Sequence, residues 1–452
     1  MRTKSVYLYI AAAIILGSLT DCKTKNINGQ SADILIHSED LYSTDDSSHK
    51  TPKKDSLVIE ISTKALDSII LEPAANSKVY RIAVILPFME DSVRRVWNES
   101  SKKNFEKFVT SKESDMSISF MEGMLMAFQD ISFQSKFEFQ FFDDKHSSEE
   151  MSSVLSDIQK DSFDVLIGPA LKVNIRKLSK YAEENQIIHI SPFSPSQSAS
   201  QGNPKYYMAE PPLIQHIKTI LQYGIDSIQD VNFKFFYHSN HSGKEYAGSV
   251  ANYLDNYNDR LSLEDKINYS NIALRNDDFI ESFSLDQYID ESEHNLLIVN
   301  SFNENFIHHF LSQAAPFKED TNLTIFGMPG WEEIETIRLE YINGSKIHFT
   351  KSYWMDGQDE LIENFIGRYH EKYFGIPSKH VFLGYELVSI FFPLIDEYGL
   401  NFNSHLLQLD FQPKARRYNF KEVLDAEGQV KRIENTSLII YKIADFEQVL
   451  VK

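Results

Sequence analysis

The sequence predicts an α/β protein built on doubly wound parallel sheets. Short apolar runs, several of them ended by a glycine, a proline or an acidic pair, alternate with amphipathic helical patterns. The clearest example is a buried strand at 165–168, a helix at 173–184 and a second strand at 187–190, which together form one βαβ unit. Parallel sheets bind ligands at the carboxyl ends of their strands. We therefore expect binding loops after Gly168-Pro169 and at 191–198.

The other elements follow the same alternation. In the first series, 80–190, we predict strands at 80–88, 137–142, 165–168 and 187–190, with helices at 118–133, 149–160 and 173–184 and a charged insertion at 91–117. In the second series we predict helices at 213–223, 245–257, 279–289, 304–315, 360–374 and 381–397. The strands of that series fall at 231–237, 295–299, 323–326 and 347–353, and a terminal hairpin at 438–443 and 446–451.

Composition limits the classes of protein to consider. A chain of 452 residues is long enough for two or three domains, and 42% hydrophobic residues supply sizeable cores. The formal charge of −20 argues against nucleic-acid binding, which needs a basic surface, and against adhesion to anionic lipid. The single cysteine, Cys22, excludes an intramolecular disulfide and a cysteine-cluster metal site.

The N-terminus is typical of a targeting segment. Basic Arg2 and Lys4 precede an apolar run at 6–19, which is short for a transmembrane span. The run ends in LTDC at 19–22, which resembles the lipobox of a bacterial lipoprotein, except that Asp21 replaces the usual small residue. We expect a signal peptide with a lipobox-like end at 1–22, lipidation of Cys22 and a flexible tether at 23–78, where polar residues dominate. A plain signal peptide or an uncleaved anchor is the alternative.

Several phrases resemble the type I periplasmic binding proteins, the leucine-binding-protein-like superfamily, over about 79–452. They are ILPF at 85–88, FMEGMLMAFQD at 120–130, FDVLIGP at 163–169, IIHISPFSPS at 187–196, FFYHSNHSGKEYAG at 235–248, LLIVN at 296–300, FLGYELVSIFFPLIDEYG at 382–399 and DAEGQVKRIENTSLIIYKI at 425–443. QGNPKYYMAEPP at 201–212 is most similar to a secreted branch, often from Bacteroidetes, that pairs this fold with peptidoglycan-binding LysM modules.

The resemblance implies two doubly wound lobes joined by a hinge, with a ligand held between them. It places lobe 1 at 79–210 plus 350–400 and lobe 2 at 211–349 plus 401–452. It also implies a substrate-binding protein of an ABC transporter, without a cofactor, that faces the periplasm from a membrane anchor. The partner would be a small polar molecule, amino acid-like or derived from peptidoglycan.

Candidate ligand-binding residues in lobe 1 lie in the loops that follow strands. Phe88 ends the first strand run, and Ala170 and Lys172 follow Gly168-Pro169, where amino-acid-binding relatives carry a serine or threonine. The missing hydroxyl argues against an amino acid ligand, whereas Lys172 at a helix start suits an anion. Ser191 and Ser194 suit a polar ligand, although Ser-Pro turns alone explain such residues. Lys172 also fits an ordinary solvated lysine.

Candidate residues in lobe 2 are Tyr246, Ser301 and Trp331. Tyr246 lies near the start of a predicted helix, where the family often has an aromatic residue that stacks on ligand; packing in the core is the alternative. Ser301 follows the strand at 295–299, and Trp331 follows the strand at 323–326, where it offers an aromatic wall.

Signs of catalysis or of a metal site are weak. The sequence has no HExxH, no Gly-x-Ser-x-Gly elbow and no Walker loop. His238 lies three residues before His241, but no acidic partner has metal-ligand spacing. The carboxylate pairs at 143–144 and 149–150 are sequence neighbours, whose side chains point apart. We therefore expect no enzyme and no metal.

Two functions remain open. The first is a receptor for a small solute. The second is a cell-envelope protein-interaction module of the same fold, similar to the lipoproteins that activate penicillin-binding proteins. The missing hydroxyl after Gly168-Pro169 favours the module, whereas the serine-rich loop at 191–198 favours the receptor.

Overall fold

The structure is a computed structural model that describes residues 78–91, 111–200, 202–275, 282–317, 322–334, 336–337, 342–343, 346–355, 359–412 and 414–451. The predicted signal peptide, Cys22 and all but the last residue of the predicted tether lie outside these ranges. The chain forms two compact units, unit 1 up to Glu210 with Met355–Asn435, and unit 2 of Pro211–Trp354 with Thr436–Lys452. Within the described ranges, no helix has the length and apolar character needed to cross a membrane.

Unit 1 contains an eight-stranded sheet in the order β11-β12-β13-β5-β4-β3-β1-β2. The strands from β5 to β2 run parallel, β13 joins β5 in parallel, and β12 and β11 continue the sheet antiparallel. Their bounds are β1 Val79–Leu86, β2 Lys136–Asp143, β3 Val165–Ile167, β4 Ile188–Ser191, β5 Tyr206–Met208, β11 Asp410–Phe411, β12 Tyr418–Leu424 and β13 Val430–Asn435.

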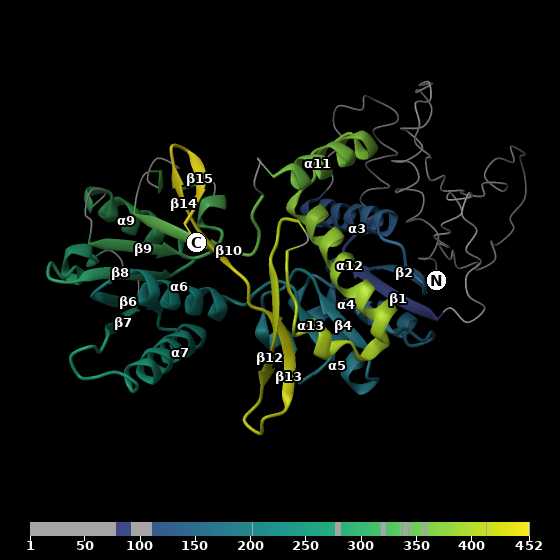
Figure 1. Cartoon of the computed structure of the whole chain (residues 1–452), viewed down its shortest axis with the longest axis horizontal. Coiled ribbons are helices and arrows are strands. Elements are labelled where there is room, and N and C mark those ends of the chain that lie inside the picture. Colours follow the sequence, from purple (N-terminus) through teal and green to yellow (C-terminus); the bar gives the residue numbers. More distant parts are fainter. Residues whose placement is uncertain are drawn as a thin grey trace, which may run out of the picture. The chain divides into compact units, whose positions relative to one another are not determined.

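Helices cover both faces of this sheet because its central strands are apolar on both sides. Ile82 and Val84 of β1 share a core with α3 and α12, which pack side by side, whereas Ala83 and Ile85 share a core with α4 and α5 on the opposite face (Figure 1). The helices are α3 Lys112–Asp130, α4 Ser148–Ile158, α5 Lys172–Glu184, α11 Glu360–Tyr373, α12 Lys379–Tyr398 and α13 Asn403–Leu406. This arrangement is the doubly wound sheet that the sequence predicts.

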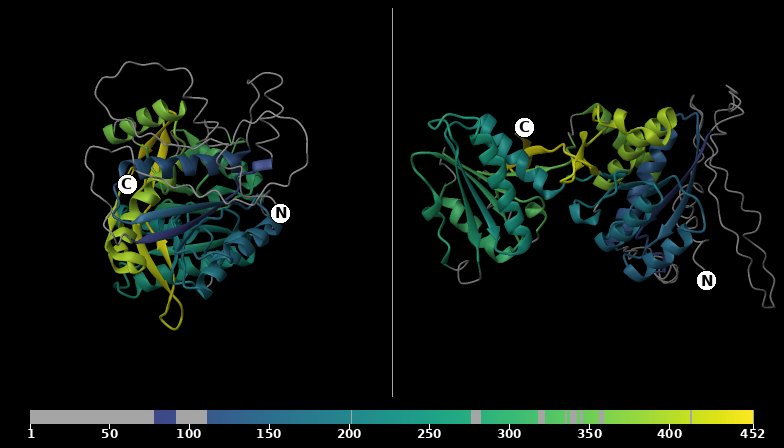
Figure 2. Two further views of the ribbon diagram at one scale, coloured as in Figure 1. Left: turned by 90° about the vertical axis from the view of Figure 1, so that its right-hand side faces the viewer. Right: turned by 90° about the horizontal axis from the view of Figure 1, so that it is seen from below.

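Unit 2 contains a seven-stranded sheet in the order β15-β14-β10-β9-β8-β6-β7. The strands are β6 Val231–His238, β7 Asn268–Leu274, β8 His294–Asn300, β9 Leu323–Gly327, β10 Ile347–Lys351, β14 Ile439–Ala444 and β15 Glu447–Leu450, and the helices are α6 Leu213–Ser227, α7 His241–Asn258 and α9 Glu304–Ala314. Here too helices lie on both faces (Figure 2): Phe233 packs beside Gly224 of α6, whereas Phe236 packs against Phe310 of α9. The predicted terminal hairpin is confirmed as the antiparallel pair β14 and β15.

The division of the chain differs from the expected one at its C-terminal end. We predicted 401–452 in lobe 2, but β12 and β13 belong to unit 1, where Ile433 pairs with Tyr207. The chain returns to unit 2 only at Thr436, and residues 350–354, expected in lobe 1, belong to unit 2. The strand β5 was not predicted, and neither was β7, which is a largely polar edge strand.

The helix predicted at 279–289 is described only from Ser282 onward. Ser282 is helical, and a short 3-10 helix, η3, follows at Leu285–Tyr288. Phe283 and Leu285 are buried in unit 2. The regular α-helix therefore does not continue through 285–289, where the prediction was too long.

Candidate functional site

The strand order of unit 1 reverses beside β1, which has β2 on one side and β3 on the other. The loops that follow β1 and β3 therefore lead to helices on opposite faces of the sheet. In open α/β sheets, this reversal leaves a crevice at the carboxyl ends of the strands, and ligands bind there. The predicted loop after Gly168-Pro169 lies at this position.

The loop after β3 is held rigidly by its backbone. The Gly168 N–H donates to the Ile190 carbonyl at 3.0 Å, and the Gly168 carbonyl accepts a hydrogen bond from Nε2 of His189 at 2.6 Å. The backbone φ of Gly168 is +94°, and a Cβ there would lie 2.0 Å from the Ile85 carbonyl oxygen. Complete burial lowers the pKa of His189 to about 4, so its ring is neutral. The loop thus fixes the start of α5 at the edge of the sheet.

Helix α5 begins without a side-chain cap. Leu171 precedes the helix and offers no hydrogen bond to its first turn, while the Lys172 side chain is exposed and Ala170 is half-buried. A side chain accepts an N–H at the start of α3, α4, α7, α9, α11 and α12, whereas α6 and α13 begin uncapped as α5 does. The positive end of the α5 dipole and an ammonium group therefore lie together at the switch point, an arrangement that favours an anionic group.

Three other candidate residues of unit 1 are inside the fold. Phe88 is buried in the core with α3 and packs edge-on against Phe141. Ser191 ends β4 and is completely buried. Ser194 is buried too, and its Oγ accepts the Ser196 N–H at 3.3 Å. In unit 1 these side chains are buried within the loops, and their contact with a ligand stays a prediction.

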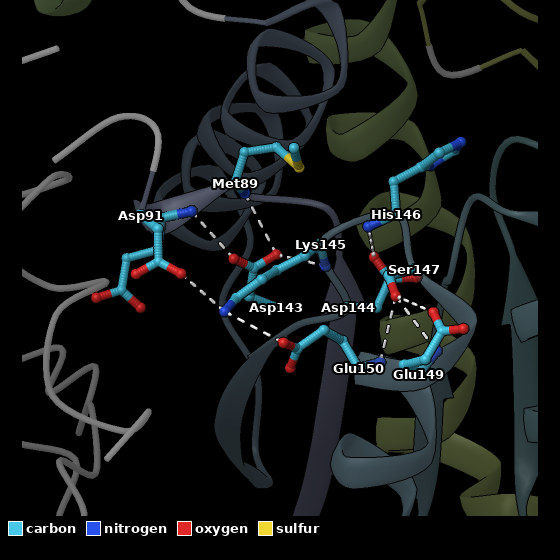
Figure 3. Close-up of polar contacts among 10 residues, drawn as sticks. Met89, Asp91, Asp143, Asp144, Lys145, His146, Ser147, Glu149 and Glu150 are labelled. Carbon is cyan, nitrogen blue, oxygen red and sulfur yellow. Dashed lines mark hydrogen bonds and ion pairs between the residues drawn. The ribbon is translucent and has the colours of Figure 1, made fainter. Parts of the chain in front are cut away.

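The loop after β2 is organised by two buried carboxylates (Figure 3). Asp143 accepts the N–H groups of Met89 and Glu90 at 3.3 and 3.0 Å, which ties the loop after β1 to the loop after β2. Asp144 accepts a hydrogen bond of 2.7 Å from Nδ2 of Asn174 in α5, and burial raises the pKa of the Asp144 carboxyl. These two acids, whose side chains were expected to point apart, join the loops of the switch point to one another.

A more exposed set of contacts surrounds this junction. Ser147 caps α4 by accepting the N–H groups of Glu149 and Glu150. The Lys145 ammonium lies 2.8 Å from Asp91 Oδ2 and 3.4 Å from Glu150 Oε1, and the Asp91 contact raises the pKa of Lys145 (Figure 3). A helix cap and surface ion pairs of this kind contribute to the structure of the loop and do not indicate a catalytic or binding role.

Unit 2 has its own switch point, beside β6, which lies between β7 and β8. His238 ends β6, and its Nε2 shares a hydrogen bond of 2.7 Å with the Ser301 hydroxyl after β8. The same hydroxyl accepts the Asn303 N–H at 3.2 Å, and the Ser301 carbonyl accepts Nε1 of Trp331 at 2.9 Å. Ser301 therefore fixes the loop between β8 and α9.

The three candidates of unit 2 have different positions. Ser301 lies at the switch point but is buried, and Trp331 is completely buried, so its ring supports the Ser301 loop instead of forming an exposed wall. Tyr246 is half-buried on α7 and packs against the core of unit 2. Phe302, next to Ser301, is 58% exposed.

Sequence reasoning considered His238 only as a metal ligand, and its pairing with Ser301 was missed. Both residues end neighbouring strands, but that signal becomes usable only when the strand order is known. Among the residues that the structure describes, no group of three or more histidine, cysteine or acidic side chains is arranged to hold a metal ion.

Comparison with solved structures identifies the fold as that of the type I periplasmic binding proteins. An ABC transporter substrate-binding protein from Desulfitobacterium hafniense has a TM-score of 0.56 and 11% identity, covering 83% of this chain and 100% of its own. A structure described as this kind of protein from the same organism in complex with Leu has a TM-score of 0.53 and 12% identity, with coverage of 83% and 100%.

A branched chain amino acid ABC transporter periplasmic ligand-binding protein from Burkholderia xenovorans has a TM-score of 0.56 and 11% identity, covering 82% of this chain and 94% of its own. No protein-family model matches the chain, and no curated protein matches it. At these identities the likeness establishes the fold, and these neighbours are solute-binding proteins.

Proposed function

We propose that the chain is an extracytoplasmic receptor for a small polar solute with an anionic group. The observation that carries the proposal is the uncapped start of α5 beside the exposed Lys172, at the strand-order reversal of unit 1. Backbone N–H groups, a helix dipole and an ammonium favour a carboxylate or a phosphate. The shared fold with ABC substrate-binding proteins supports the receptor class.

The finer parts of the proposal concern location and ligand. As in a lipoprotein, the residues before Cys22 would be cleaved off and Cys22 would carry the lipid, so that the receptor faces the periplasm and delivers solute to a transporter or a sensor. The ligand would be amino acid-like or derived from peptidoglycan, in line with the resemblance to the secreted Bacteroidetes branch. In place of a serine or threonine hydroxyl after Pro169, the N–H groups of α5 and Lys172 would hold its anionic group.

Thermal melting of the chain from Lys23 onward tests the proposal. Amino acids, small peptides, sugars and muropeptides are added one at a time. A ligand that binds only the native state stabilises it by about 2.7 kcal/mol at 100 times its Kd, which raises the melting temperature. We expect a shift with one anionic class.

Two lysines of the same helix give a matched control. Lys172→Met should weaken the ligand-dependent shift, because it removes the cation at the start of α5. Lys180→Met removes an equally exposed cation further along the helix, where Lys180 lies 3.9 Å from Glu184, and should leave the shift unchanged. Equal effects of the two variants would contradict a site at the start of α5.

The envelope-interaction module is the second candidate. Burial of Phe88, Ser191 and Ser194 leaves fewer of the predicted side chains available to a solute, which favours this candidate. Phe302, 58% exposed beside Ser301, is a position at which contact with a protein partner can be tested. If no compound in the library shifts the melting temperature, this module becomes the better explanation. Cross-linking in the cell envelope with Phe302→Ala as the control would then identify its protein partner.

A further inference from the structure

Three aromatic rings surround an ammonium group in unit 2. The Nζ of Lys351, the last residue of β10, lies 4.4 Å from the ring centroid of Tyr441, 4.7 Å from that of Trp354 and 5.0 Å from that of Tyr353. A cation within about 6 Å of a ring centroid is attracted by the electrons of the ring face. We call Tyr353, Trp354 and Tyr441 the aromatic cage.

A carboxylate lies behind the cage. Tyr441 is completely buried, and its hydroxyl donates a hydrogen bond to Oε1 of Glu332. The other carboxylate oxygen, Oε2, is buried without a hydrogen-bond partner. Burial and the nearby Glu332 raise the pKa of Tyr441, so its hydroxyl remains a donor and its ring remains neutral. Negative charge behind the ring strengthens the attraction of the cage for a cation.

The cage lies at the functional edge of the sheet. Lys351 ends β10, which runs parallel to β9, so the cage is at the carboxyl edge, where ligands bind in folds of this class. Tyr353 and Trp354 are half-buried, so neither residue is sealed in the core of unit 2. Lys351 Nζ also donates to Oε1 of Gln448 on the exposed strand β15.

We propose that the aromatic cage is a binding site for a quaternary ammonium group and that Lys351 occupies it from within. A primary ammonium is strongly hydrated, so Lys351 recovers hydration when its flexible stem swings out into water. A quaternary ammonium has no N–H to hydrate and interacts well with aromatic faces, the interaction by which cages select such ligands. A methylated ammonium ligand therefore displaces Lys351.

This cation site goes beyond the proposed receptor function, and all its residues belong to unit 2. It involves neither α5 nor Lys172. An experiment that disproved the anion site in unit 1 would therefore not disprove the aromatic cage. Its test uses a cation that the anion site would not take.

Titration of the full chain with tetramethylammonium chloride by isothermal calorimetry tests the proposal, with potassium chloride at equal concentration as the control for ionic strength. Removing the resident cation with Lys351→Ala should strengthen binding about tenfold or more, because apparent affinity scales with the fraction of empty sites. Lys244→Ala, at an exposed lysine on α7, should leave the affinity unchanged. Adding Trp354→Ala to Lys351→Ala should abolish binding.

Two results would overturn the proposal. One is the lack of saturable binding by folded Lys351→Ala, and the other is binding that does not depend on Trp354. Circular dichroism checks that each variant is folded. If Lys351→Ala does not fold, Lys351→Gln supplies the same readings, because it removes the charge and keeps most of the stem.

Discussion

Replacing Gly384 of α12 by alanine should destabilise unit 1 because two helices cross there in backbone contact. A Cβ on Gly384 would lie 2.0 Å from the Phe120 carbonyl oxygen of α3, and a Cβ on Gly123 would lie 1.9 Å from the Val381 carbonyl oxygen of α12. Ordinary carbon–oxygen contacts are more than 1 Å longer than this, so α3 and α12 must separate. A backbone carbonyl, unlike a side chain, cannot rotate away.

The magnitude follows from two opposing effects. Alanine is favoured over glycine inside a helix by about 1 kcal/mol. Overpacking costs about 1–3 kcal/mol, and the upper end applies here because both contacting elements are rigid. We therefore expect Gly384→Ala to lower the free energy of unfolding by about 2 kcal/mol.

Gly367 of α11 is the matched control. An added Cβ there meets no atom within 4 Å, so Gly367→Ala should raise the free energy of unfolding by up to about 1 kcal/mol. Guanidinium unfolding followed by circular dichroism measures both variants. The same chemical change should thus have opposite signs at two helical positions. If the free energy of unfolding of Gly384→Ala equals or exceeds that of the original chain, the close contact of α3 and α12 is refuted.

Three further predictions concern buried charge and the N-terminal segment. Folding lowers the pKa of His189 from 6.5 to about 4, so the free energy of unfolding is highest above pH 6.5 and falls as the pH drops toward 4. His189→Gln should remove about 3 kcal/mol of this acid-dependent loss of stability. An unchanged pH profile of chemical unfolding in the variant would contradict this prediction. Arg416 is buried 3.6 Å from Glu386, and burial raises the pKa of Glu386 to about 7. Arg416→Met should therefore lower the free energy of unfolding by about 3–5 kcal/mol at pH 8, and by less at pH 5, where Glu386 is protonated. Equal losses of stability at both pH values would contradict this prediction. Deleting 23–70 should leave the cooperative melt intact, and its loss in calorimetry would show that this segment belongs to the fold.

The elements of both sheets were predictable where local pattern and burial agree. Apart from Arg81, the run at 80–88 is apolar because β1 is buried on both faces, and the helical spacing at 173–184 follows the buried face of α5. Patterns fail where an edge strand is largely polar, as in β7.

Candidate site residues were predictable by position but not by exposure. The sequence placed Lys172 and Ser301 after strands, and both lie at switch points. It could not distinguish the exposed Lys172 from the buried Ser191, because a polar residue in a loop is compatible with either. The pairing of His238 with Ser301 joins residues far apart in the chain, and no spacing reveals it.

The sequence by itself determined the alternation of strands and helices, the acidic charge and the resemblance to a two-lobed binding fold, since these depend on local pattern and composition. Only the tertiary structure decided which strands are neighbours, that β12 and β13 join unit 1, and that Tyr441 meets Lys351 and Trp354. The physical reason is that sheet pairing and cage formation depend on contacts between distant segments. Those contacts are selected by the free energy of the whole packed unit and not by any one stretch of residues.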